Sequence, residues 1–183
     1  MSEATKSLKL VKRSPGSDVL VLLTCLSLTV FFDMVIAITA GILLASLLFM
    51  KELAALTQVI DITDNRDFVH KALPANCKVF KIRGALFFAA ADRIFGELSQ
   101  QLEGHDGIVL HMQYSAYLDA GGLSAIEKLI SYCEKKQIPI RFSSWQFQPL
   151  KTLARARTEV KGPLDLSFST LDEAIDNVIT TGK

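Results

Sequence analysis

Asp119 is the residue of this chain whose type and position most clearly indicate local chemistry. It follows a predicted strand over residues 107–113 and comes just before an amphipathic helix. A carboxylate placed before the first helical turn can accept N–H groups that have no partner inside the helix. The glycines that follow have no helix-propensity advantage, so they indicate that another backbone or a binding partner comes close there. The candidate regulatory or partner surface consists of Asp119, Ala120, Gly121, Gly122 and Ser124.

The histidines and cysteines do not have the spacing of a catalytic or metal site. Cys25, Cys77 and Cys133 are far apart and form no CxxC pair, which favours free thiols. No histidine has a serine, cysteine or carboxylate in a triad-like position. His111 alternates with apolar residues on a predicted strand, so we interpret it as a packed or surface side chain. The sequence therefore predicts no catalytic residue, no metal and no cofactor, and a protein that is not an enzyme.

Charged residues form two small groups. Asp61, Asp64 and Asp67 lack the spacing of a calcium loop and indicate turn and linker structure. Lys151, Arg155 and Arg157 form either a solvated basic face or a patch facing the inner leaflet or an acidic protein. The net charge of only +1 gives no electrostatic reason to expect nucleic-acid binding.

The most apolar stretch is residues 19–50, whose only charge is Asp33 near its middle. One continuous helix would be about 48 Å long at about 1.5 Å per residue, more than a bilayer core of about 30 Å. It would also bury Asp33 near the bilayer centre at a cost of about 2.5 kcal/mol or more. Two shorter helices, residues 18–31 and 34–50, that turn at Phe32-Asp33 avoid both problems. We therefore expect a transmembrane hairpin in contact with membrane lipid, with a buried soluble helix pair as the alternative.

The flanks of this hairpin set its expected orientation. Residues 1–17 are polar and basic, and Lys51 follows the second helix. By the positive-inside rule we expect both flanks to lie on the cytoplasmic side of the membrane. We expect residues 51–75 to be a linker, in which the second helix first continues to residue 56.

Residues 76–183 read as an α/β domain. Predicted strands cover residues 78–83, 85–88, 107–113, 137–143 and 164–168, with Gly84 as a turn between the first two. Predicted helices cover residues 89–102, the stretch after Asp119, residues 148–156 and a final helix capped by Ser169 or Thr170. The third of these helices is expected to turn Leu150 and Leu153 inward. Such alternation predicts a mostly parallel sheet with helices packed against it.

Three segments of this domain resemble a STAS domain, the module shared by sulfate-type transporters and anti-sigma factor antagonists. They are GALFFAAADRIF, IVLHMQYSAYLDAGGLSAIEKL and WQFQPLKTLARA. The apolar pair centred on Phe-Phe-Asp resembles the last two membrane helices of the SulP anion transporter family. Residues 86–92 and 118–123 resemble the bacterial branch of that family that carries four-carbon dicarboxylates.

The resemblance also has two departures. Stand-alone antagonists have a phosphorylatable serine directly after the aspartate, where this chain has Ala120, and Ser115 or Ser124 would be an unusual replacement. SulP transporters have about fourteen membrane helices with the anion site between broken helices, whereas this chain has two. The resemblance implies the C-terminal part of a dicarboxylate or sulfate transporter of a bacterial inner membrane, which does not transport alone. Its partners would be the remaining transporter helices or a homodimer mate, and a cytosolic protein. A membrane-tethered regulatory STAS protein is the alternative.

Overall fold

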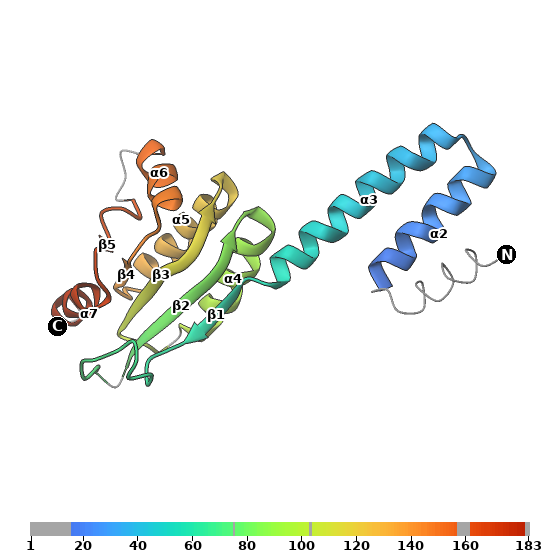
Figure 1. The fold of residues 1–183 in the computed structure, drawn as a ribbon. Helices are drawn as coiled ribbons and strands as arrows, with labels where there is room; N and C mark the ends of the chain where they lie inside the picture. The colour runs from blue at the N-terminus through green and yellow to red at the C-terminus, as the bar shows by residue number, and fades with distance from the viewer. Residues whose placement is uncertain (1–15, 75, 103, 157–161, 182–183) are drawn as a thin grey trace. The chain divides into compact units, whose positions relative to one another are not determined.

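The computed structural model describes residues 16–74, 76–102, 104–156 and 162–181, in two compact units (Figure 1). The first unit extends to Leu53, and the second begins at Ala54. Of the expected polar segment, residues 1–15 lie outside the described part of the chain.

The first unit is a helical hairpin. Helix α2 (Gly16–Phe31) and helix α3 (Met34–Ala55) are joined at Phe32 and Asp33, as the sequence predicted. Small residues allow the two helices to approach each other. The Cys25 thiol lies 3.7 Å from the carbonyl oxygen of Ala37. A Cβ atom at Gly41 would lie only 2.2 Å from the Cys25 sulfur.

The outer surface of the hairpin is apolar. Large side chains of both helices are exposed: Leu20, Leu22, Leu23, Leu26, Val30, Phe31, Met34, Val35, Ile36, Ile38, Ile42, Leu43, Leu47 and Phe49. Four hydroxyl groups, those of Thr24, Thr29, Thr39 and Ser46, donate to the carbonyl oxygen four residues earlier. Among the described helices, α3 is long and apolar enough to cross a membrane, and the apolar part of α2 is shorter. A surface of this kind is stabilised by contact with lipid or with apolar protein surface rather than with water.

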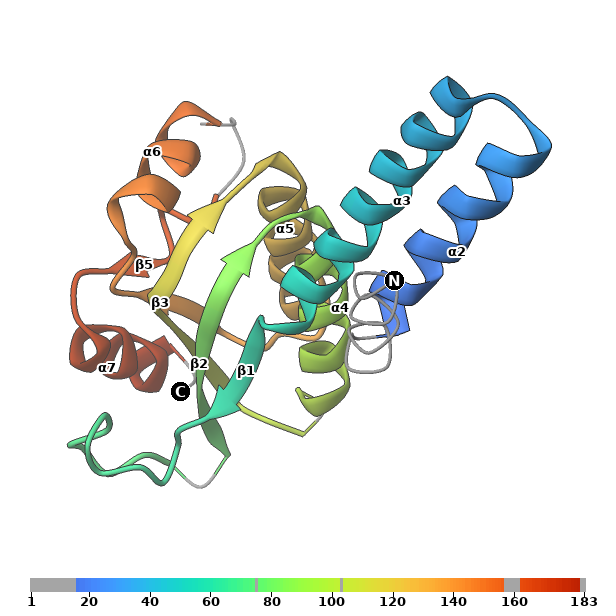
Figure 2. The ribbon, with the colours of Figure 1, turned by 45° about the vertical axis from the view of Figure 1, so that its right-hand side comes forward.

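The second unit is built on a five-stranded sheet with the order β1-β2-β3-β4-β5 (Figure 2). The strands are β1 (Gln58–Asp61), β2 (Cys77–Leu86), β3 (Gly107–Leu118), β4 (Ile140–Ser143) and β5 (Ser167–Phe168). Strand β1 pairs with β2 in the antiparallel direction, and the other pairings are parallel. The mostly parallel sheet that the sequence predicted is confirmed.

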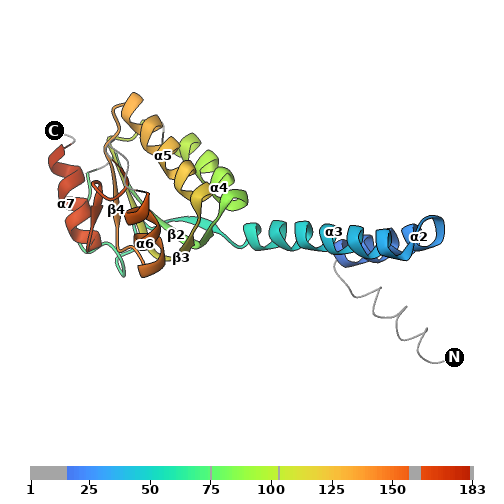
Figure 3. The ribbon, with the colours of Figure 1, turned by 90° about the horizontal axis from the view of Figure 1, so that it is seen from above.

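Helices cover both faces of this sheet, which Figure 3 shows nearly edge-on. On one face lie α4 (Phe88–Gln101) and α5 (Ala120–Lys135), and on the other lies α7 (Leu171–Thr181). Alternate residues of β2 point to opposite faces: Phe80 and Ile82 contribute to the larger core with α4 and α5, and Val79 to the core with α7. Helix α6 (Phe147–Arg155) adds Leu153 to the larger core. Leu150, expected to face inward, is 38% exposed, because Pro149 and Leu153 are the buried side chains of this short helix.

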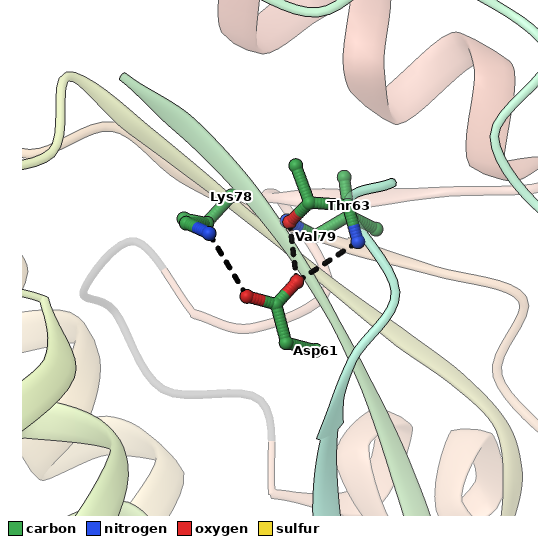
Figure 4. Close-up of polar contacts among 4 residues, drawn as sticks. All are labelled: Asp61, Thr63, Lys78 and Val79. Carbon is green, nitrogen blue, oxygen red and sulfur yellow. Dashed lines mark hydrogen bonds and ion pairs between the residues drawn. The ribbon is translucent and has the colours of Figure 1, made fainter. Parts of the chain in front are cut away.

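Strand β1 was not predicted, since it lies within residues 51–75, which we assigned to a linker. Its outer end is fixed by a polar turn in which Asp61 accepts hydrogen bonds from Thr63 and forms an ion pair with Lys78 (Figure 4). The Thr63 hydroxyl in turn accepts the N–H of Val79 at 3.0 Å. This network supports turn structure at the start of the acidic cluster. Partial burial raises the pKa of Asp61, but the hydrogen bonds from Thr63 and Lys78 outweigh it, so the pKa lies below the ordinary value.

The predicted turn at Gly84 was wrong. Residues 77–86 form one continuous strand, and the register with β3 shifts on either side of Arg83. Gly84 has a φ of +116°, which suits a β-bulge rather than a chain reversal. As a result Phe88, expected in a strand, begins α4.

Other element boundaries also differ from expectation. Strand β3 extends to Leu118, so Ser115 lies in a strand and not in a loop. Strand β4 begins only at Ile140, since Gln137 has a φ of 57° and Pro139 precedes the ladder. The final helix has the predicted cap: the Thr170 hydroxyl accepts the N–H of Glu173, and the Glu173 carboxylate accepts the N–H of Thr170, both at 3.3 Å.

Candidate functional site

Asp119 lies where β3 ends and α5 begins, and its carboxylate connects two helix starts. One oxygen accepts the N–H of Gly122 at 2.7 Å, which confirms the predicted cap. The other oxygen accepts the N–H of Phe88 at 3.3 Å, at the start of α4. The sequence did not reveal this second contact, because Phe88 is 31 residues away along the chain. A single carboxylate therefore satisfies otherwise unpaired N–H groups of both helices.

The glycines after Asp119 face another part of the same chain. A Cβ atom at Gly121 would lie 2.4 Å from the Cβ of Phe88 and 2.8 Å from its Cα. A Cβ atom at Gly122 would lie 2.2 Å from the carbonyl oxygen of Leu86. Of the two explanations left open by the sequence, the described structure shows the close approach of another backbone. Gly122 is buried and Gly121 is half-buried.

The remaining residues of the predicted surface differ in exposure. Ala120 and Ser124 are exposed at the first turns of α5. Ser115, the other serine near this site, is fully buried, and its hydroxyl has no hydrogen-bond partner in the structure. A modifying enzyme could reach Ser124 without unfolding the domain, whereas Ser115 is inaccessible.

Helices α4 and α5 pack against each other and leave a groove between them. Its lining includes Phe95, Gly96 and Leu129, with Asp92 and Lys128 at its rim. The Asp92 and Lys128 side chains are 3.5 Å apart and largely exposed. The groove is therefore apolar along its floor with charges of both signs at its edge, a pattern that suits a protein partner.

Arg93 on α4 binds the backbone at the start of the second unit. Its guanidinium donates to the carbonyl oxygens of Ala54 at 3.0 Å and Thr57 at 2.8 Å and pairs with Glu97 at 2.9 Å. Thr57 is 1% exposed, and its hydroxyl donates to the carbonyl oxygen of Ala85 at 3.0 Å. These contacts satisfy the carbonyl group of Ala54, in the last turn of α3, and that of Thr57, just after the helix. The role of Arg93 was not predicted from the sequence, because the carbonyl groups that it binds lie 36 and 39 residues earlier in the chain.

His111 lies in a polar network on the α7 side of the sheet. It is 4% exposed, and its ring nitrogens lie 3.1 Å from the Ser143 hydroxyl and 3.0 Å from the Gln113 side-chain oxygen. The ring also contacts Phe68 and Tyr114, over which the Lys81 ammonium group lies. Burial lowers the pKa of His111 and the nearby Lys81 charge lowers it further, against a raising effect of the Gln113 hydrogen bond. His111 is therefore a packed, neutral side chain at pH 7, one of the two roles that the sequence indicated.

The cysteines of the second unit are not arranged for nucleophilic chemistry. Burial, with a contribution from Glu134, raises the pKa of Cys133 to about 12. Burial and the Asp106 charge also raise the pKa of Cys77. Because the thiolate is the reactive form, both thiols are unreactive at pH 7. All three cysteines are free, and the described residues include no cluster of three or more candidate metal ligands.

Helix α6 carries the described part of the predicted basic face. Lys151 and Arg155 are exposed, and Arg157 lies outside the described residues. The helix is joined to the end of β3 by Gln148, which accepts the N–H of Leu118 at 2.8 Å and donates to its carbonyl oxygen at 3.1 Å. Thr152 donates to the same carbonyl oxygen at 3.1 Å. The basic face therefore lies close to the end of β3, which Asp119 follows directly.

Comparison with known proteins places this geometry in a family. The STAS domain family model matches residues 70–174. The chain is 23% identical over 142 residues to the "Putative sulfate transporter YvdB" of Bacillus subtilis (strain 168), which covers 77% of this chain and 27% of that protein. The chain thus spans about a quarter of the length of this curated relative.

Solved structures share the fold at low sequence identity. The murine Slc26a9 anion transporter in its inward-facing state matches 98% of this chain and 31% of its own, with a TM-score of 0.69 and 15% identity. A sulfate transporter family protein from Wolinella succinogenes matches 64% of this chain and 98% of its own, with a TM-score of 0.52 and 23% identity. The unphosphorylated anti-sigma factor antagonist SpoIIAA matches 68% of this chain and 96% of its own, with a TM-score of 0.50 and 15% identity.

Proposed function

Because the chain belongs to the STAS domain family, we propose that it is the C-terminal portion of a SulP-type anion transporter. In this proposal α2 and α3 are its last two membrane helices, and the STAS domain is a cytoplasmic regulatory and interaction module. The transported anion is a sulfate or, on the motifs of residues 86–92 and 118–123, a four-carbon dicarboxylate. We do not expect the chain to transport alone, since the residues that the structure describes include no site between broken helices near the bilayer midplane.

The observation that carries this proposal is the exposed apolar surface of the hairpin directly before a STAS domain. Side chains such as Phe31 and Val30 are 80% and 70% exposed in the isolated unit. The intrahelical hydrogen bonds of Thr24, Thr29, Thr39 and Ser46 let these hydroxyls enter an apolar medium. Further support is the fold shared with Slc26a9 over 98% of this chain.

A topology experiment tests the membrane part of the proposal. We expect the chain to stay in the membrane after alkaline carbonate extraction of bacterial inner membranes. A cysteine at Asp33 should react with an impermeant maleimide added outside, while a C-terminal reporter should be active only in the cytoplasm. Release by carbonate, or an external C-terminus, would contradict the proposal.

A transport experiment tests the rest. The chain should be expressed with and without the coding sequence upstream of residue 1, in cells that lack their own sulfate and dicarboxylate uptake. We expect uptake of labelled sulfate or succinate only with the upstream helices, and reduced or altered uptake when residues 54–183 are removed. Uptake by the isolated chain would refute the proposal that transport needs the upstream helices and that the STAS domain regulates it.

The second candidate function is a membrane-tethered regulatory STAS protein that binds cytosolic proteins. Its support is the exposed face formed by Ala120, Ser124 and the groove between α4 and α5, which is free to receive a partner in the described structure. Since Ala120 replaces the serine that antagonists phosphorylate, such a partner would bind without a phosphoryl switch at that position. A functional transporter reading frame upstream of residue 1 would exclude this alternative.

A further inference from the structure

Exposed aromatic side chains gather at one edge of the STAS sheet, where the parallel strands end. Phe88 at the start of α4 is 54% exposed, Tyr117 near the end of β3 is 49% exposed, and Phe147 at the start of α6 is 80% exposed. Contacts already described join these positions: Asp119 binds the N–H of Phe88, and α6 is hydrogen-bonded to Leu118. We call this edge, defined by Phe88, Tyr117 and Phe147 with Lys151 and Arg155, the aromatic edge.

The charges of the aromatic edge are positive. Helix α6 contains Lys151 and Arg155, both exposed, and no acidic residue. Within the part of the chain that the structure describes, neither cation forms an ion pair. The nearby carboxylate of Asp119 is negative, but it is half-buried and accepts two backbone N–H groups, whereas Lys151 and Arg155 are exposed. Aromatic rings with a polar neighbourhood and unpaired cations are the composition that proteins use at membrane interfaces.

Chain connectivity brings the membrane close to this edge. The apolar run of α3 ends at Met50, and Ala54 is already buried against Phe87 and Ala90 beside the start of α4. Four helical residues span only about 6 Å. If α3 crosses the bilayer, the start of α4 lies within reach of the headgroups whatever the angle between the two units.

We propose that the aromatic edge is a membrane-contact surface that binds anionic phospholipid headgroups, with Phe88, Tyr117 and Phe147 at the interface and Lys151 and Arg155 on phosphate. This inference rests on the proposed membrane insertion of α3. Contact with lipid would limit how far the STAS domain moves away from the membrane, and a partner protein on the edge would compete with that contact.

The test uses the full chain with Cys25 replaced by alanine, reconstituted into nanodiscs of phosphatidylcholine and phosphatidylserine. A bimane label is placed on Phe147→Cys, at the aromatic edge, or on Gln100→Cys, an exposed position near the opposite end of α4. Phospholipid with a nitroxide on its headgroup is the quencher. A third label, on Leu43→Cys, reports the hairpin with a nitroxide on the acyl chain.

We expect the headgroup nitroxide to quench the label at position 147 at least about twofold more than the label at position 100. The difference should disappear in phosphatidylcholine alone and with Lys151→Glu and Arg155→Glu together, since about fivefold in affinity is lost for each cation near an anionic surface. Equal quenching at positions 147 and 100, or quenching that ignores lipid and protein charge, would overturn the proposal. Protection of position 147 from aqueous iodide without quenching by lipid would also overturn it, since the edge would then be covered by protein.

The hairpin label separates the two levels of inference. Quenching of position 43 by the acyl-chain nitroxide with no quenching at position 147 would reject the aromatic edge as a lipid surface and leave the proposed transporter role intact. Absence of quenching at position 43 would reject membrane insertion of α3 and, with it, the lipid contact.

Discussion

Replacement of Gly122 by alanine should destabilise the STAS domain, because the new Cβ atom would meet a backbone atom. It would lie 2.2 Å from the Leu86 carbonyl oxygen and 2.8 Å from a methyl group of Leu118. The same carbonyl oxygen accepts the N–H of Asp119 at 3.3 Å, so α5 cannot move outward without weakening that bond. Overpacking of this kind costs about 3 kcal/mol at the upper end of its usual range. Alanine recovers about 1 kcal/mol of helix propensity, which leaves a net loss of about 2 kcal/mol.

Gly96 provides the matched control. It lies inside α4, it is exposed, and a Cβ atom there would meet nothing within 4 Å. Gly96→Ala should therefore gain up to about 1 kcal/mol from helix propensity. The assay is urea unfolding of a fragment of residues 54–183, which form a compact unit, followed by the fluorescence of Trp145, the only tryptophan. If Gly122→Ala is no less stable than Gly96→Ala, the close approach of α5 to β2 is wrong.

Three further predictions concern other contacts of the STAS domain. Arg93→Ala should increase trypsin cleavage at Lys51 severalfold in the detergent-solubilised chain, because it removes the hydrogen bonds to the carbonyl groups of Ala54 and Thr57. The control Glu97→Ala keeps those two hydrogen bonds and should not increase cleavage. Equal cleavage of the two variants would contradict the role of Arg93. Since burial lowers the pKa of His111, this side chain binds a proton more readily in the unfolded chain than in the folded one. The free energy of unfolding should therefore fall as the pH drops below about 6.5. His111→Gln should remove the part of this pH dependence that is due to His111. If the urea midpoints of the two proteins change equally with pH, His111 is not the group responsible. Cys133, with a pKa of about 12, should react with Ellman's reagent at pH 8 only after unfolding in urea, and rapid reaction of the native fragment would show that the thiol is accessible.

Elements with a strong local pattern were predictable from the sequence. The apolar face of α5 and the capping group Asp119 depend on residues close together in the chain, and so does the reciprocal cap of Thr170 and Glu173. The hairpin was predictable because one charge, Asp33, interrupts an otherwise continuous apolar run. In each case the physical cause acts within a few residues.

Features that depend on distant parts of the chain were not predictable. Strand β1 has only four residues, and its two middle residues, Val59 and Ile60, are half-buried where the strand pairs with β2. Gly84 suggested a turn, but the structure explains this glycine by the close approach of Thr57. The Cα of Thr57 would lie 2.8 Å from a Cβ atom at position 84. The role of Arg93 likewise depends on carbonyl groups 36 and 39 residues earlier. The sequence shows such residues but not the backbone that meets them.

The position of Asp119 also bears on how the STAS domain would act in the proposed anion transporter. Helix starts attract anions because their N–H groups are unpaired and the helix dipole is positive there. At the starts of α4 and α5, the carboxylate of Asp119 already accepts the N–H groups of Phe88 and Gly122 and adds a negative charge. A sulfate or dicarboxylate would therefore meet repulsion and find these donors occupied. This favours a STAS domain that acts through its surfaces, the groove between α4 and α5 and the aromatic edge, rather than through a second anion site of its own.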